Sequence, residues 1–154
     1  MANDHKRNFH TDQWLLLIYS FVVLVLSLIY EQLITSQNSL LIGNASLAFG
    51  HIVIHPSTRL FLQKSIGITR VLRQLLKLVE ESWLSKPAKK NVAIFLTKLV
   101  KIDDKYESLF SHPRSFLSSF SFLQEFRKQH GTEILHSALK DVDLWSQSSI
   151  FIQR

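Results

Sequence analysis

Residues 14–30 read WLLLIYSFVVLVLSLIY, a run of 17 residues without a charged side chain. A helix rises about 1.5 Å per residue, so this run covers roughly 25 Å of a hydrocarbon core that is about 30 Å thick. Residues on both flanks can lie at the membrane interfaces. Trp14 and Tyr30 stand at the two ends, where amphipathic aromatic rings favour the headgroup region. The sequence therefore predicts a transmembrane helix over residues 13–34.

Two other readings of this run stay open. A buried core helix of a soluble protein is one, although a surface helix would carry a charge every third or fourth position. A cleaved secretion signal is the other, with Lys6 and Arg7 as its basic N-terminal part. The apolar part of a signal is usually about 7–15 residues long, and no Ala-x-Ala-like cleavage site follows Tyr30. An uncleaved anchor is favoured over both.

A second apolar stretch, residues 39–54, reads SLLIGNASLAFGHIVI and also lacks Lys, Arg, Asp and Glu. Its membrane signal is weaker because it contains Asn44 and His51, and because Gly43 and Gly50 loosen a helix. It is a candidate second membrane segment. An apolar loop, or a core helix packed on the folded domain, is the alternative.

The charges around the two apolar stretches bear on topology. Lys6 and Arg7 precede the first stretch, which predicts a cytoplasmic N-terminus because basic residues favour the cytoplasmic side of a span. A two-helix hairpin would also leave the basic residues beyond residue 58 in the cytoplasm, whereas a single span would place them on the opposite side. The pattern favours the hairpin, with a single span as the alternative.

The chain's net charge of +6 is concentrated in one block. Residues 59–101 contain ten basic and two acidic side chains, a net of +8, and the segments on either side are each −1. A polybasic region beside a membrane gains about 1 kcal/mol of attraction to an anionic leaflet per cation. A solvated helix face is the main alternative, and nucleic-acid binding is less favoured. The predicted membrane-surface patch comprises Arg59, Lys64, Arg70, Arg73, Lys77, Lys86, Lys89, Lys90, Lys98 and Lys101.

Gly (4) and Pro (3) are scarce and Leu is abundant, which favours an all-α fold. Apolar residues at helical spacing predict a bundle over residues 57–145, between an N-terminal tail (1–12) and membrane segments on one side and a C-terminal tail (146–154) on the other. The predicted helices cover residues 60–84, 89–102, 103–110, 114–130 and 132–145. Lys86-Pro87 should end the first, Asp103-Asp104 should separate the second from the third, and Gly131 should stop the fourth.

The fourth predicted helix carries a stripe of large apolar side chains. Spacing of three and four residues is typical of a helix face that packs in a core, and a face that binds a partner protein is the alternative. The candidate partner face comprises Phe116, Phe120, Leu123 and Phe126.

No motif in the sequence points to catalysis. The chain has no Cys, so disulfides and thiolate chemistry are excluded. His51 and His55 have a spacing that suits a metal, but no Glu follows the first His as a zinc-protease motif requires. The carboxylate pairs Asp103-Asp104 and Asp141-x-Asp143 lack the other ligands of a calcium loop. We therefore predict no catalytic, cofactor-binding or metal-binding residues and no cofactor.

The sequence thus predicts a non-catalytic integral membrane protein, an adaptor or structural subunit with a basic helical domain at the membrane surface. Expected partners are anionic lipid headgroups and another membrane or cytoplasmic protein. One alternative is a membrane-embedded enzyme or transport accessory that uses His51, His55 and Asn44, and another is a membrane-tethered nucleic-acid binder. If the bundle is independent, removing residues 1–55 should leave a folded helical fragment.

Overall fold

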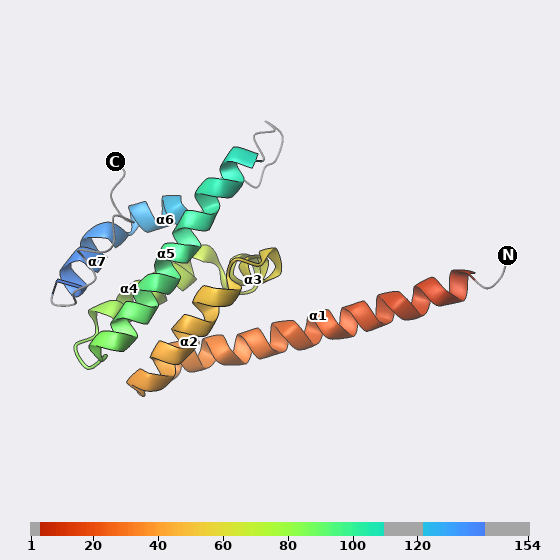
Figure 1. The fold of residues 1–154 in the computed structure, drawn as a ribbon, viewed down its shortest axis with the longest axis horizontal. Helices are drawn as coiled ribbons and strands as arrows, with labels where there is room; N and C mark the ends of the chain where they lie inside the picture. The colour runs from red at the N-terminus through yellow and green to blue at the C-terminus, as the bar shows by residue number, and fades with distance from the viewer. Residues whose placement is uncertain (1–3, 110–121, 141–154) are drawn as a thin grey trace.

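The computed structural model describes the backbone of residues 4–109 and 122–140, and the side chains of residues 13–101 and 122–140. Within these ranges the chain is helical and contains no strand, which confirms the all-α prediction. Figure 1 shows a long N-terminal helix, α1, that projects from a bundle of shorter helices. The predicted order, an apolar helix of membrane-span length followed by a helical bundle, is therefore confirmed.

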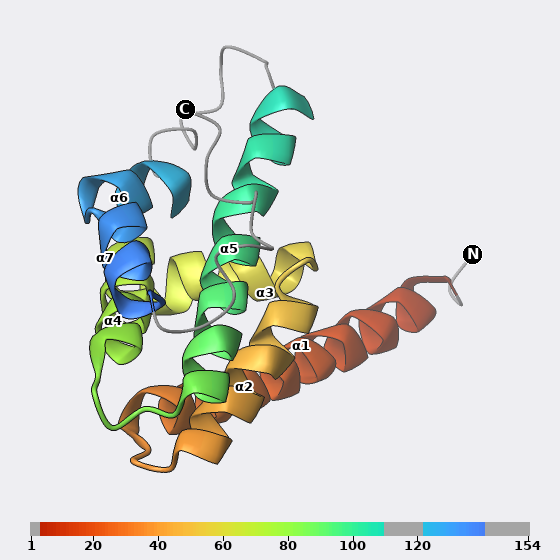
Figure 2. The same ribbon diagram turned by 60° about the vertical axis from the view of Figure 1, so that its left-hand side comes forward.

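Helix α1 (Asp4–Thr35) has 32 residues and is about 48 Å long. Its residues 13–25, called here the exposed segment, are exposed or half-buried. Its residues 26–35, called the packed segment, lie against the bundle through Leu26, Tyr30 and Leu33, which are buried. The hydroxyl of Tyr30 donates a hydrogen bond of 2.7 Å to Oε1 of Gln74. About one third of α1 is thus part of the folded core, while the rest extends away from it (Figures 1 and 2).

Helix α2 (Ser39–Ile52) follows a short turn. Asn38 caps it, because Oδ1 of Asn38 accepts hydrogen bonds from the backbone N–H groups of Leu40 and Leu41 at 3.0 and 3.2 Å. One side of α2 faces α1, where the rings of Phe49 and Tyr30 meet edge to face at 5.9 Å. Since α2 contacts α1 on this side and α5 on another, it belongs to the bundle.

The contact between α2 and α5 depends on small residues. A Cβ on Gly43 would lie 3.2 Å from Cα of Ala88, so glycine lets the two backbones approach closely. The side-chain amide of Asn91 donates to the carbonyl of Gly43 at 3.1 Å, and Phe49 stacks on Phe95 with ring centroids 5.4 Å apart. Gly43, which would weaken an isolated helix, therefore serves this packing.

The prediction of one continuous helix over residues 60–84 is wrong. The chain instead forms α3 (Pro56–Phe61), a π-helical turn η1 (Leu62–Ile66) and α4 (Ile68–Glu80). Gly67 separates the turn from α4 with φ of +93°, a conformation that residues with side chains rarely adopt. The apolar spacing continues across this break, so periodicity alone did not reveal it.

Helix α5 (Lys86–Leu109) corrects two further predictions. Pro87 lies in its first turn instead of ending the preceding helix, because the N–H groups of a first turn have no partner within the helix anyway. Asp103 and Asp104 lie inside α5 and do not separate two helices. This long helix contacts α2, α4 and α6 and is the centre of the bundle (Figure 2).

The chain ends, as far as it is described, in α6 (Phe122–Lys128) and α7 (Gly131–Ala138). The first part of the predicted helix 114–130 lies outside the described residues. His130, not Gly131, adopts the left-handed conformation between the two helices, with φ of 55°. Gly131 begins α7 and is buried, and a Cβ there would overlap the ring of Phe126. Its role is close packing, which corrects the prediction that it stops a helix.

The buried apolar side chains of the described residues form one connected core, which includes Leu26 of α1 at one end of the chain and Leu139, after α7, at the other. It includes Ile42, Phe49 and Val53, all fully buried and all outside the predicted bundle range of 57–145. A fragment that lacks residues 1–55 would expose the apolar surface of α5 that these residues cover. We therefore expect residues 26–140, rather than 57–145, to be the unit that folds.

Candidate functional site

The exposed segment of α1 is the most unusual surface of the molecule. Nine of its large apolar side chains are 40–67% exposed: Trp14, Leu15, Leu16, Leu17, Ile18, Tyr19, Phe21, Val22 and Leu24. Removing such side chains from water would stabilise the protein by roughly 1 kcal/mol each, or on the order of 10 kcal/mol together. An apolar surface of this extent marks contact with a membrane or another protein.

Among the described residues, one helix is long and apolar enough to cross a membrane, Gln13–Thr35 with 23 residues. It agrees closely with the predicted span over residues 13–34. The candidate second segment corresponds to α2, which together with the helical stretch Pro56–Ile66 passes the same test only as a pair bent by 118°. With 14 residues α2 is about 21 Å long, shorter than a hydrocarbon core of about 30 Å. The hairpin stays a prediction.

Helix α2 has an outward surface without a charged side chain. We call it the outer α2 face, and its Leu40 side chain is 71% exposed. It lies opposite the residues that pack on α1 and α5, and its members recur at intervals of three and four. The outer α2 face comprises Leu40, Leu41, Asn44, Leu47, Ala48 and His51.

The ten residues of the predicted basic patch do not form one surface. Arg59 is buried on α3, and Lys64 is exposed on η1. The others divide between α4 (Arg70, Arg73 and Lys77) and α5 (Lys86, Lys89, Lys90, Lys98 and Lys101). Because α4 and α5 pack against each other through their buried residues, their exposed faces point apart. The net charge of the block is thus spread over at least two separate faces.

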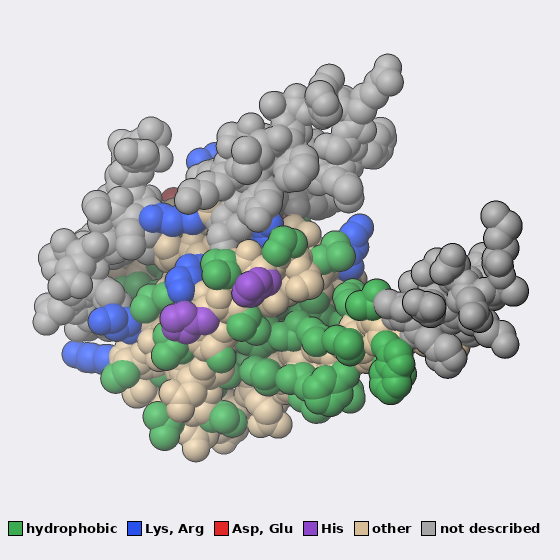
Figure 3. Space-filling model, turned by 45° about the vertical axis from the view of Figure 1, so that its right-hand side comes forward, with side chains coloured by type: hydrophobic (Ala, Val, Ile, Leu, Met, Phe, Trp, Pro, Cys, Tyr) green, Lys and Arg blue, Asp and Glu red, His purple; other side chains and the backbone are tan. Residues whose placement is uncertain are grey.

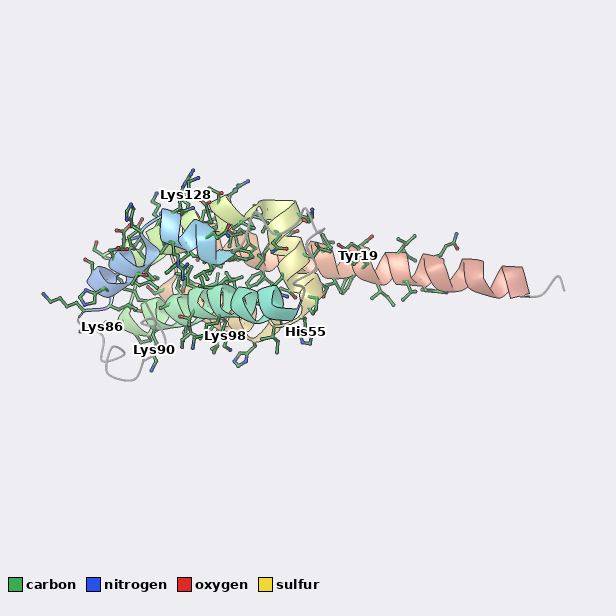
Figure 4. The ribbon with its side chains drawn as sticks, turned by 90° about the horizontal axis from the view of Figure 1, so that it is seen from above. Tyr19, His55, Lys86, Lys90, Lys98 and Lys128 are labelled. Carbon is green, nitrogen blue, oxygen red and sulfur yellow. The ribbon has the colours of Figure 1, made fainter. Side chains whose placement is uncertain are left out.

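The lysines of α5 border the outer α2 face. Figure 4 shows Lys86, Lys90 and Lys98 along one side of the bundle, with Lys128 of α6 on the opposite side. Cδ of Lys98 lies 3.8 Å from the position that a Cβ of Gly50 would take, so the lysine stem covers part of α2. Figure 3 shows hydrophobic side chains along α1 that continue onto the bundle, with His and Lys or Arg side chains beyond them. The outer α2 face therefore lies between an apolar helix and a row of cations.

The candidate partner face is only half described. Phe116 and Phe120 lie outside the described residues. Leu123 is half-buried on α6, and Phe126 is 3% exposed, with its ring against Gly131. Phe126 is therefore a core residue.

The candidate catalytic and metal residues show no common site. His51 and His55 are exposed near the end of α2, and Asn44 is exposed on the outer α2 face. In the described part of the chain, no group of three or more His, Cys, Asp or Glu side chains could bind a metal ion. The side chains of Asp103, Asp104, Asp141 and Asp143 lie outside the described residues.

Two features of the site escaped prediction from the sequence. Tyr30 was expected only as an interfacial aromatic residue, yet it is buried and bonded to Gln74. The outer α2 face was also missed, although its members recur at helical spacing without charge. That spacing was the available signal, but it does not reveal which side of α2 faces α5.

Comparisons with known proteins give no family for this chain. No family model, curated protein or solved structure matches it. Its function must therefore be inferred from its own surfaces, of which the exposed segment of α1, the outer α2 face and the two basic faces are the most distinctive.

Proposed function

We propose that this protein is a non-catalytic integral membrane protein that presents a basic helical bundle at a membrane surface, as an adaptor or structural subunit of a membrane complex. The exposed segment of α1 carries the proposal, since its apolar side chains surround the helix and are unfavourable in water. A helix that is apolar on all sides suits insertion into lipid better than attachment along a surface.

The two basic faces suggest a division of roles. The α5 lysines lie beside the uncharged outer α2 face, which suits an anionic lipid surface. On α4, Arg70, Arg73 and Lys77 form an exposed stripe at intervals of three and four residues. This stripe points away from the packed side of α4, so it suits a protein partner with an acidic surface.

A photo-crosslinking residue tests the adaptor role in native membranes. At position 73, on the exposed face of α4, we expect covalent adducts between this chain and a partner protein. At position 17, on the exposed segment, we expect adducts with lipid instead. The adaptor role would be contradicted if positions 73 and 77 both gave no protein adduct while the chain remained integrated in the membrane.

Two groups of basic residues predict how the chain is oriented in the membrane, and a single membrane crossing can agree with only one of the two predictions. Lys6 and Arg7 predict a cytoplasmic N-terminus, while the ten cations of residues 59–101 predict a cytoplasmic bundle. A hairpin would satisfy both, but it would require α2 to cross the membrane while it packs on the lysine-bearing α5. We therefore propose a single crossing by α1, with the bundle in the cytoplasm because its cations are more numerous.

Protease treatment of sealed membranes tests this orientation. We expect a C-terminal tag to be cleaved from the cytoplasmic side and an N-terminal tag to be protected. Cleavage of both tags would support the hairpin that the charge pattern favours. Protection of the C-terminal tag would place the bundle on the other side and remove the argument for the anionic cytoplasmic leaflet.

A further inference from the structure

The exposed segment of α1 is too short to cross a bilayer by itself. Its 13 residues cover about 20 Å, and the hydrocarbon core is about 30 Å thick. The span cannot be extended toward the N-terminus without placing Asp12 in the hydrocarbon layer. The missing length of about 10 Å must come from the packed segment, which lies against the bundle. Residues 26–30, which precede Glu31, add about 7.5 Å, so part of the bundle surface must reach the same depth as these residues.

The outer α2 face is the surface best suited to that depth. Only three residues separate the end of α1 from the start of α2, and the rings of Phe49 and Tyr30 are in contact between the two helices. Leu40, Leu41 and Leu47 are all exposed on α2, and no charged side chain interrupts them. Figure 3 shows hydrophobic side chains both along the projecting helix and on the neighbouring surface of the bundle.

The lysines of α5 mark the boundary of this surface. Lys90 is exposed, and Lys98 is half-buried with Cδ of its stem next to Gly50 of α2. Long basic side chains take this arrangement at membranes, with the stem on apolar surface and the charge at the headgroups. On this side the bundle thus presents apolar side chains next to cations.

We propose that the outer α2 face inserts into the boundary between headgroups and acyl chains of an anionic phospholipid leaflet, with Lys90 and Lys98 among the headgroups. Interfacial helices of this kind lie about 5–10 Å deep, which matches the missing length of α1. The bundle is then embedded in the leaflet surface and not tethered above it. This inference rests on the proposed membrane anchor.

A second copy of the chain fits the outer α2 face less well than lipid does. A symmetric dimer pairs the same surface of both copies, and the outer α2 face has no acidic side chain that could pair with the lysines beside it. Like charges across an interface are unfavourable, whereas anionic headgroups attract the same lysines.

Spin labels on single cysteines can measure the depth directly, because the chain has no Cys of its own. The full chain would be labelled at Ile18, Leu47 or Lys77, all exposed, and reconstituted into vesicles of phosphatidylcholine and phosphatidylserine. Oxygen concentrates in hydrocarbon, and a polar nickel chelate stays in water. We expect the label at 47 to be accessible to oxygen and protected from nickel, as at 18, and the label at 77 to show the reverse.

The three positions separate failure of the inference from failure of the anchor. If the label at 47 behaves like the one at 77 while the label at 18 is in hydrocarbon, the inference is overturned and the anchor stands. If the label at 18 is also in water, the proposed anchor itself fails. If the label at 47 is protected from both reagents and broadened by a neighbouring spin, a second copy covers the face and the lipid assignment is overturned.

Charge reversal tests the part played by the lysines. In the chain labelled at 47, the pair Lys90→Glu and Lys98→Glu should shift the label toward water, so that nickel accessibility rises. The matched pair Arg73→Glu and Lys77→Glu on α4 should leave it unchanged. Equal nickel accessibility in the two variants, at unchanged helix content, would overturn the assignment of Lys90 and Lys98 to the headgroups.

Discussion

Replacing Leu17 and Phe21 with arginine is expected to release the protein from the membrane. Both side chains lie in the middle of the exposed segment and are 61% and 67% exposed. An arginine at the centre of a membrane-spanning helix costs about 2.5–3.5 kcal/mol, so the pair costs about 5–7 kcal/mol. Since each 1.4 kcal/mol is a factor of ten, insertion should weaken by a factor of about 10⁴ to 10⁵. Alkaline extraction followed by vesicle flotation would measure the loss.

The pair Leu17→Ala and Phe21→Ala provides the matched control. Alanine removes apolar surface at the same positions but introduces no charge, so this variant should remain in the membrane pellet. Neither position contacts the bundle core, so all three chains should have the same helix content in detergent. If the arginine variant also resisted alkaline extraction, the exposed segment would not lie in hydrocarbon, and its apolar side chains would have to be covered by protein.

Replacing Phe49 with alanine is expected to cause the largest loss of stability in the bundle. Its side chain is fully buried and contacts both Tyr30 of α1 and Phe95 of α5. Truncation of a buried Phe to Ala usually lowers the free energy of unfolding by about 3–5 kcal/mol, because apolar burial is lost and a cavity remains. Thermal unfolding of the detergent-solubilised chain, followed by circular dichroism, should show a melting temperature lower by roughly 10 °C or more.

Leu47→Ala is the control on the same helix. Leu47 lies two residues earlier but on the outer α2 face, so its loss should change the free energy of unfolding by about 0.5 kcal/mol or less. Equal melting temperatures for the two variants would mean that α2 is not part of the cooperative core. That result would also restore the expectation that the chain folds without residues 1–55.

Local sequence signals predicted the helices of this protein better than they predicted its breaks. The uncharged run at 14–30 is sufficient to predict α1 as a membrane or core helix, because a helix without charge on any side can be stable only in lipid or in a core. Gly67 and Pro87 show where local signals were insufficient. A glycine inside an apolar repeat can be tolerated or can break the helix, and a proline can end one helix or begin the next. Packing around α4 and α5 decides between these outcomes.

The sequence identified residues of the candidate site but not the surfaces on which they lie. All ten cations could be read from the sequence, yet Arg59 is buried, Lys64 lies on η1, and the other eight divide between the exposed faces of α4 and α5. Distance along the sequence does not show which cations share a surface. Residues 70 and 90 belong to different helices, and the packing of the buried sides of these helices sets the direction in which each exposed face points. The outer α2 face was missed for the same reason.

By itself, the sequence determined that this chain is helical, that it has one strongly apolar N-terminal helix, and that its positive charge follows the apolar region. These properties depend on local spacing and composition. Only the tertiary structure decided that residues 26–35 and α2 belong to the core, and that the apolar segment left free is about 20 Å long. These two features depend on long-range contacts, such as those of Phe49 with Phe95 and of Gly43 with Ala88. Such contacts form only when helices that are distant in the sequence pack together.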